Sequence, residues 1–299
     1  KSKLTSEQYQ DLCDFEGNAN GLKILAESRS GTPGGLRLSY ATLGAFVKYP
    51  KASLPIKPTS HVADKKYGYF QAQKDFFSEV AQELSLVKNG KVLRHPLTYL
   101  VEAADDICYT IIDFEDGINL GLIDEEFALE YLIKLVKDNI NTIKYNSLKK
   151  SSDRLAYLRS LAINTLVTEA ASVFINNEEA ILNGKFTTSL LDKSNYKAQV
   201  DDIIKISIQK IYKSNNVIDK EIAGYKILNT LLEVFTNSVE NYKTGVTTQF
   251  DQLILNDLIL GNPDDFSTYQ YLIETCNYIS RLTDSNAMLN FQKINGNLS

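Results

Sequence analysis

Several residue types are scarce in this sequence of 299 residues, which has no tryptophan, one methionine, two histidines and three cysteines. Cys13, Cys108 and Cys276 lie far apart and form no Cys-x-x-Cys pair, so we expect neither a disulfide framework nor a zinc cluster. With His61 and His95 as the two histidines, most multi-histidine metal sites are excluded for this sequence alone. The cysteine usage favours a cytoplasmic location.

Long apolar runs and an excess of positive charge are also missing. No apolar run approaches the length that spans a bilayer, and residues 1–7 show no secretory apolar region, so we expect no membrane partner. A net charge of -5 argues against a generally basic nucleic-acid-binding surface but leaves local basic patches open. The hydrophobic content of 43% suffices for one large core or two modest ones.

Residues 94–117 hold the most ordered pattern of charge in the chain. Pro96 suits the first turn of a helix and Gly117 can close its far end, which predicts one helix of about six turns. At about 100° per residue, an apolar face separates from an acidic one. The predicted core face carries Leu100, Ala104, Ile107, Ile111, Phe114 and Ile118, and the predicted acidic face carries Glu102, Asp105, Asp106, Tyr109, Asp113 and Asp116.

The acidic face has two interpretations. It can be an ordinary solvated helix surface, as most acidic helix faces are. It can also belong to a site, because Asp105 projects beside the apolar edge formed by Val101 and Ile112, whereas Asp106 projects about 100° further round. This geometry predicts that Asp105 is the more buried of the two. A partly buried carboxylate needs a cation, a hydrogen-bond donor or a metal as its partner.

Two clusters upstream of this helix combine lysines with tyrosines. They are residues 48–51 (Lys-Tyr-Pro-Lys) and residues 65–70 (Lys-Lys-Tyr-Gly-Tyr-Phe). A lysine pair taken singly is usually solvated surface. Two such clusters near an acidic helix suit a polyphosphate whose remaining charge sits on a metal, because lysines act as point charges on phosphate oxygens and tyrosine hydroxyls donate to them.

The rest of the chain is predicted to be helical, and we find no convincing strand pattern and no internal repeat. We therefore expect a single all-α domain over residues 1–299, with an active-site part (1–120) and a helical C-terminal part (121–299). Loops are expected at residues 28–35, 52–64 and 184–194. Besides the helix in residues 94–117, helices are predicted from residue 5, over 22–26 and 39–51 (stopped by Pro50), and over 74–87, 124–145, 153–183, 196–212, 219–242 and 263–290.

Five blocks together resemble the bacterial deoxyguanosine triphosphate triphosphohydrolases (dGTPases), a branch of the HD-domain metal-dependent phosphohydrolases. They are residues 15–19 (Phe-Glu-Gly-Asn-Ala), 40–50, 65–70, 102–109 (Glu-Ala-Ala-Asp-Asp-Ile-Cys-Tyr) and 113–117 (Asp-Phe-Glu-Asp-Gly), with weaker matches at 221–225 and 278–284. The resemblance implies a multi-helical HD-domain-like fold that hydrolyses dGTP or other dNTPs to deoxynucleoside and triphosphate. It further implies a divalent metal, Mg²⁺ or Mn²⁺, a homo-oligomer, and single-stranded DNA as a family-level regulator.

The resemblance also implies roles for single residues. Asp105 would be the distal aspartate of the metal site, and Tyr109 and Asp113 would line the deoxyribose side of the pocket. Asp106 would have a supporting part. The remaining implied residues are Asn18, Lys48, Tyr49 and one of Lys65 or Lys66 for the triphosphate, and Tyr212 and Glu221 for the base pocket.

The sequence departs from the family's pattern in its histidines. The family's metal site needs a histidine, then an adjacent His-Asp pair, and then a catalytic histidine, all upstream of the Phe-Glu-Gly-Asn block. Here that block starts at Phe15, and neither His61 nor His95 is followed by aspartate. We expect the chain to be the C-terminal part of a longer triphosphohydrolase. The alternatives are a degenerate paralogue that cannot bind metal in the family's manner, a non-catalytic all-α subunit that binds nucleotide or forms oligomers, and a helical interaction protein with no nucleotide site.

Overall fold

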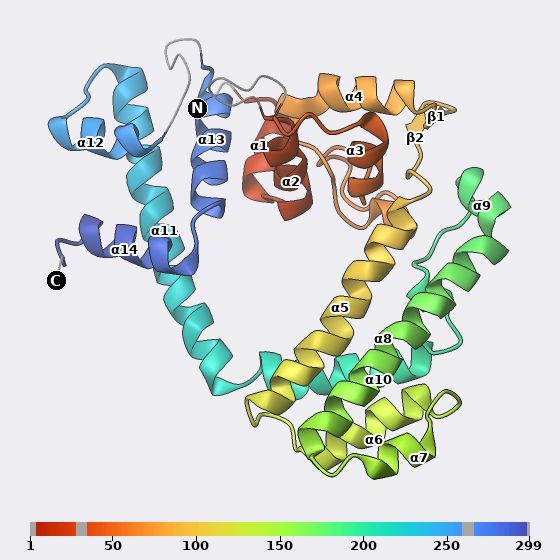
Figure 1. Cartoon of the computed structure of the whole chain (residues 1–299). Helices are drawn as coiled ribbons and strands as arrows, with labels where there is room; N and C mark the ends of the chain where they lie inside the picture. Colours follow the sequence, from red (N-terminus) through yellow and green to blue (C-terminus); the bar gives the residue numbers. More distant parts are fainter. Residues whose placement is uncertain (1–3, 28–34, 259–265, 298–299) are drawn as a thin grey trace.

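The computed structural model describes residues 4–27, 35–258 and 266–297 and is 69% helical. Fourteen α-helices lie within these described ranges (Figure 1). The prediction of an all-α, multi-helical architecture is confirmed. One antiparallel hairpin, β1 (Val87–Lys88) with β2 (Lys91–Val92), was not expected. Its turn residues Asn89 and Gly90 both have positive φ, as tight hairpin turns require.

The N-terminal part consists of α1 (Ser6–Cys13), α2 (Gly17–Ala26), α3 (Tyr40–Phe46) and α4 (Lys74–Glu83). The expected helix start at Thr5 is confirmed, since its side chain and that of Gln8 form a capping box. Leu22, Leu43 and Phe77 pack together in the core of α2, α3 and α4. Of the predicted loop at residues 28–35, residues 28–34 lie outside the described ranges.

The largest core lies between α5 (Thr98–Asn119), α6 (Glu125–Val136), α8 (Ser151–Asn176) and α10 (Lys197–Ser207). Figure 1 shows α5 and α8 running side by side, with α6 and the short α7 (Thr142–Ser147) below them. Along α8, buried residues recur at helical spacing, and Leu158, Ala162 and Leu166 are fully excluded from water. This core fixes α5 and α10 relative to one another.

Three predicted helices are each interrupted. The helix expected over 124–145 ends at Val136, and Asn141 caps α7 by accepting a bond from the Lys144 backbone. The helix expected over 153–183 breaks at Asn177 before α9 (Glu178–Leu182). The helix expected over 263–290 is instead α13 (Thr268–Ser280) and α14 (Asp284–Ile294), each started by a hydroxyl cap, whereas residues 263–265 lie outside the described ranges.

The C-terminal helices return to the start of the chain. The long α11 (Asn215–Thr244) packs with α12 (Gln249–Asp257), which was not predicted, and with α13 and α14. In Figure 1, α13 lies beside α1 and α2. Buried polar contacts join them: the Tyr269 hydroxyl donates to Asp11 at 2.5 Å, and Lys23 pairs with Glu274 at 2.7 Å. Helix α13 therefore forms one packed region with α1 and α2.

Helix α8 corrects the expectation that no segment is long and apolar enough to cross a bilayer. Its 26 residues contain a window of mean hydropathy 1.2, which meets that test by length and composition. The same helix supplies Leu155, Leu158, Ala162 and Leu166 to the largest core. A core helix of a globular protein passes the same test, so this is weak evidence for a membrane span.

Candidate functional site

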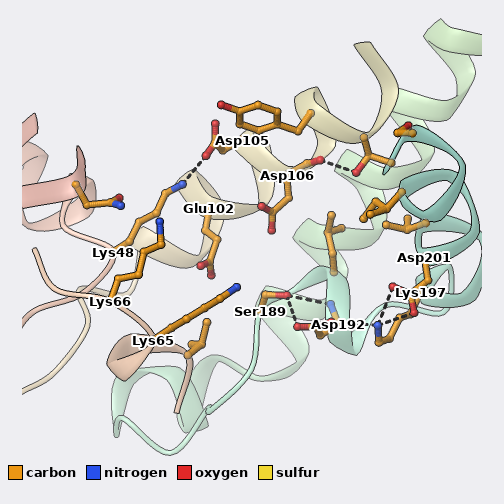
Figure 2. A pocket seen from close by; sticks show the side chains of 18 of the residues that line it. Lys48, Lys65, Lys66, Glu102, Asp105, Asp106, Ser189, Asp192, Lys197 and Asp201 are labelled. Atoms are coloured by element: carbon orange, nitrogen blue, oxygen red, sulfur yellow. Dashed lines mark hydrogen bonds and ion pairs between the residues drawn. The ribbon is translucent and has the colours of Figure 1, made fainter. Parts of the chain in front are cut away.

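A cavity of about 600 Å³ opens between the N-terminal part, α5 and α10 (Figure 2). It is lined from two regions of sequence, residues 18–110 and residues 189–212. The predicted active-site part, residues 1–120, therefore supplies one side of this cavity, and α10 with the segment before it supplies the other. The division into two parts within one domain stays a prediction.

Most of the residues proposed from the sequence meet at this cavity. Asp113 does not line it but accepts a hydrogen bond at 2.5 Å from the hydroxyl of Tyr212, which does. Glu221 is exposed on α11 and is not part of the lining. The eight predicted residues that line the cavity are Asn18, Lys48, Tyr49, Lys65, Lys66, Asp105, Tyr109 and Tyr212.

Helix α5 begins and ends close to the predicted positions. Thr98 is its first residue, two after Pro96, and the 22-residue length gives the expected six turns. Gly117 does not close the helix, which continues to Asn119. Instead, a Cβ at Gly117 would lie 2.5 Å from the Ile211 side chain, so the glycine permits close packing of α5 against the segment after α10.

The burial predicted for the aspartate pair is wrong. The side chain of Asp105 is 48% exposed, because the apolar edge of Val101 and Ile112 beside it is itself exposed. Asp106 is the more buried carboxylate. Burial, together with the nearby carboxylates of Glu102 and Asp105 and against the opposing charge of Lys48, raises the pKa of Asp106 from the usual 3.8 to about 6.

The two faces predicted for α5 also need correction at one residue each. Ala104, expected in the core, is exposed, and Glu102, expected on the acidic face opposite the core, is buried. Glu102 can be buried because Arg94, which precedes the helix, donates to both of its carboxylate oxygens at 2.6 and 2.8 Å. A bidentate pair of this kind satisfies a charge that could not otherwise be buried.

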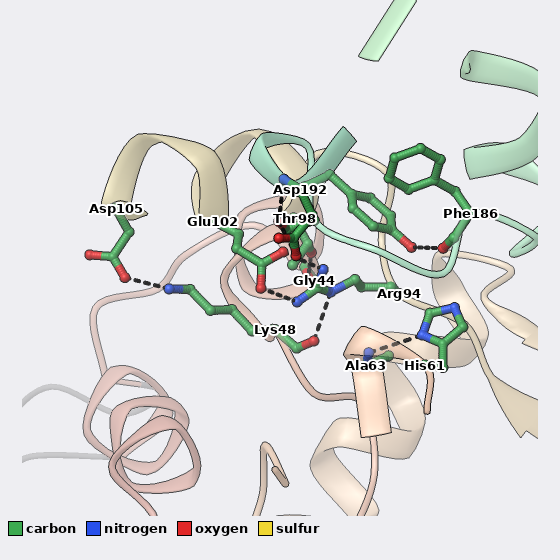
Figure 3. Close-up of polar contacts among 12 residues, drawn as sticks. Gly44, Lys48, His61, Ala63, Arg94, Thr98, Glu102, Asp105, Phe186 and Asp192 are labelled. Atoms are coloured by element: carbon green, nitrogen blue, oxygen red, sulfur yellow. Dashed lines mark hydrogen bonds and ion pairs between the residues drawn. The ribbon is translucent and has the colours of Figure 1, made fainter. Parts of the chain in front are cut away.

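The same arginine connects α5 to the lysine segment. Its Nε donates to the Lys48 carbonyl at 2.8 Å (Figure 3). Its guanidinium lies 4.8 Å from the centre of the Tyr99 ring. Lys48 in turn extends its amine to Asp105 at 2.5 Å. Arg94 thus holds the backbone from which Lys48 reaches the cavity.

The lysines gather on one side of the cavity. Figure 2 shows Lys48, Lys65 and Lys66 close together, across from the side chains on and before α10. Lys66 lies 3.5 Å from Glu16, which also accepts a bond at 2.6 Å from the Asn18 amide. Two of these three lysines therefore contact a carboxylate that an anionic ligand could replace.

The α10 side carries a different set of groups. Lys197 pairs with Asp201 at 2.7 Å and with Asp192 at 3.2 Å, so its charge is already compensated. Burial, together with the hydrogen bond to Asp113, raises the pKa of the Tyr212 hydroxyl to about 12. Tyr212 ends a π-helical turn, η4 (Ile208–Tyr212), that links α10 to α11. Such turns occur often at functional sites.

The described residues do not make a complete site for Mg²⁺ or Mn²⁺. Among them, no group of three or more histidine, cysteine, aspartate or glutamate side chains is arranged to hold a metal ion. Asp105 is ion-paired to Lys48, and Figure 3 places His61 and Asp105 at opposite ends of the polar network. His61 Nδ1 accepts a bond from the Ala63 backbone, and burial lowers the pKa of its ring.

Several residues that line the cavity or support its lining were not predicted as part of a site. Arg94 and Glu102 were visible in the sequence, but their spacing of eight residues across a helix start gives no signal of a bidentate pair. The lining residues Ser189, Asp192 and Ser207 come from segments that only tertiary packing brings to α5. No periodicity or motif in the sequence could have found them.

Comparison with known proteins bears on the identity of the chain, although no protein-family model matches it. A deoxyguanosinetriphosphate triphosphohydrolase-like protein of Synechocystis sp. is 36% identical over 297 residues, covering 96% of this chain and 66% of that protein. One of the same name from Listeria monocytogenes is 32% identical over 319 residues, covering 98% and 68%. A deoxyguanosinetriphosphate triphosphohydrolase of an Enterobacter species is 29% identical over 279 residues, covering 87% and 53%.

These relatives agree with the resemblance carried by the five sequence blocks. The chain spans about two thirds of the length of the first two relatives. The similarity runs along nearly the whole of this chain, including the segments that line the cavity. The chain belongs to the deoxyguanosinetriphosphate triphosphohydrolase family.

Proposed function

We propose that this chain forms the nucleotide-binding wall of a metal-dependent triphosphohydrolase that cleaves dGTP, and other dNTPs, to deoxynucleoside and triphosphate. The proposal rests chiefly on the convergence of Lys48, Lys65 and Lys66 in one cavity with Asp105 and Asp106. The names of the relatives support the same class of substrate. In phosphoryl transfer, positioning and charge compensation supply the larger share of the rate, and lysines provide both.

The lysine side suits a triphosphate. Lys48 and Lys66 each contact a carboxylate, so a phosphate that binds here would exchange one anion for another at each amine. Asn18 and the buried Tyr49 add neutral polar groups beside them. Burial, reinforced by Glu102, raises the pKa of the Tyr49 hydroxyl to about 12, which keeps it a hydrogen-bond donor at neutral pH.

A metal would need ligands from outside the described residues. Mg²⁺ prefers about six oxygen ligands in octahedral geometry, and of the groups here we assign only Asp105 to it. Its hydrogen-bonded ion pair with Lys48, at 2.5 Å, fixes the position of this carboxylate beside the cavity. Lys48 would then pass from Asp105 to a phosphate oxygen when both metal and nucleotide bind.

Hydrolysis by the product of the complete coding sequence tests this function. With dGTP and Mn²⁺ we expect release of triphosphate, and we expect Asp105→Ala to abolish it while leaving the melting temperature nearly unchanged, since an exposed ion pair contributes little. Unchanged turnover in Asp105→Ala would remove Asp105 from the proposed metal site. Lys193→Ala, an exposed lysine outside the cavity lining, serves as the matched control.

A non-catalytic subunit that binds nucleotide is the second candidate. It is favoured by the pairing of Asp105 with Lys48, which satisfies both groups without a metal. It predicts that dGTP raises the melting temperature but is not hydrolysed with any divalent metal. A homo-oligomer, a cytoplasmic location and control by single-stranded DNA stay predictions for either candidate.

A further inference from the structure

The side chain of Ser207 differs from those of three other serines within described helices. Ser78, Ser160 and Ser172 each donate to the carbonyl four residues back, at 2.8 to 2.9 Å, as serines within helices commonly do. Ser207, the last residue of α10, is 4% exposed, and its Oγ has no partner among the described residues. Yet Ser207 lines the cavity. Its hydroxyl is therefore a buried polar group beside the cavity that no described residue satisfies, and such a group calls for a partner.

Ser207 belongs to a row of side chains on one face of α10. Val200, Ile204 and Ser207 follow one another at spacings of four and three residues, and all three line the cavity. Two apolar side chains followed by one hydroxyl suit a flat, uncharged ring with a polar edge. Beyond them, η4 brings Tyr212 to the same wall.

The charges of the cavity give a bound nucleotide one orientation. Lys48, Lys65 and Lys66 lie opposite α10, while Lys197 on α10 is neutralised by Asp192 and Asp201. A phosphate chain placed against α10 would meet carboxylates, whereas an uncharged moiety would not be repelled. The phosphates therefore belong on the lysine side and the nucleoside on the α10 side.

From these observations we infer that Ser207 is a specificity-determining residue that hydrogen-bonds the nucleobase, with Val200 and Ile204 packed on the face of the ring. The inference rests on the proposed nucleotide-binding function. It adds that the α10 side of the cavity recognises the nucleobase. A hydroxyl both donates and accepts, so its contribution depends on which polar group the base presents.

Calorimetric titration tests the inference. The wild type, Ser207→Ala and the control Ser172→Ala are each titrated with the four common dNTPs and with inorganic triphosphate. We expect Ser207→Ala to weaken at least one dNTP about five- to tenfold and to change the order of affinities among the four, with triphosphate unchanged. Removal of a buried hydroxyl without a partner should not lower the melting temperature, and Ser172→Ala should alter none of the affinities.

Three results would overturn the inference, and they are distinguishable. Equal weakening of all four dNTPs with triphosphate unchanged would assign Ser207 to the sugar. Equal affinities in wild type and Ser207→Ala would show that the hydroxyl contacts no ligand. Absence of binding of any dNTP to the wild type would overturn the proposed function itself, and with it the role of Ser207.

Discussion

Substitution of Asp106 by asparagine should stabilise the protein at neutral pH. Asparagine keeps the shape of the side chain but removes a charge that α5 partly buries beside Glu102 and Asp105. The pKa of Asp106 rises from 3.8 to about 6 in the folded protein. Each pKa unit corresponds to about 1.36 kcal/mol, so ionisation costs the folded state at most about 3 kcal/mol. Because part of the carboxylate reaches water, we expect a smaller gain: Asp106→Asn should raise the free energy of unfolding by about 1–2 kcal/mol at neutral pH.

The pH dependence of this gain follows from the sign of the shift. A folded-state pKa above the unfolded value means that the unfolded chain loses its proton first as pH rises, so wild-type stability falls as pH passes from about 4 to above 6. The gain in Asp106→Asn should be complete above pH 7, fall to about half near pH 5 and vanish below pH 4.

Urea unfolding of both proteins at pH 8 and pH 5 measures this difference. Asp105→Asn is the matched control, because its half-exposed carboxylate forms an ion pair with Lys48, and we expect a change of less than about 1 kcal/mol. If Asp106→Asn were no more stable than wild type at pH 8, or if its gain did not change with pH, the burial argument would be refuted.

Three further substitutions probe the elements that position the cavity. Arg94→Met leaves Glu102 buried and unpaired, so the free energy of unfolding should fall by about 3–5 kcal/mol in urea titrations, with partial recovery in Arg94→Met/Glu102→Gln. Tyr212→Phe removes the donor to Asp113 and should cost about 0.5–1.5 kcal/mol in the same assay. Leu158→Ala opens a void in the largest core and should cost about 2–5 kcal/mol, while a loss below 1 kcal/mol would contradict the packing described.

The parts of the fold that the sequence predicts are those controlled by local patterns. The length of α5 follows from Pro96 and a sustained apolar period, and the cap at Thr5 from its capping box. The breaks at Asn141 and Asn177 were missed because apolar residues continue at helical spacing across both. Asn141 starts a new helix after α6 has ended at Val136, and Asn177 ends α8; the spacing of apolar residues does not reveal either cap.

The candidate site was likewise predicted in part: residue types close together in sequence were recognised, and features set by tertiary packing were missed. Lysines and carboxylates close to α5 in sequence were recognised because their residue types fit a polyphosphate, and the cavity unites them. The order of burial of Asp105 and Asp106 was predicted wrongly, since it depends on a rotation of α5 set by its contacts with α8 and on the Arg94 pair. Ser207 was missed because its place opposite α5 is fixed by tertiary packing alone.

Binding of inorganic triphosphate to the lysine side tests the central claim most directly. Calorimetric titration at low salt should show binding to the wild type, at least tenfold weaker binding to Lys65→Met/Lys66→Met, and near wild-type binding to Lys65→Arg/Lys66→Arg, which retains both charges. Equal affinity in the methionine and arginine variants, or no binding to the wild type, would contradict the claim that this cavity holds the triphosphate.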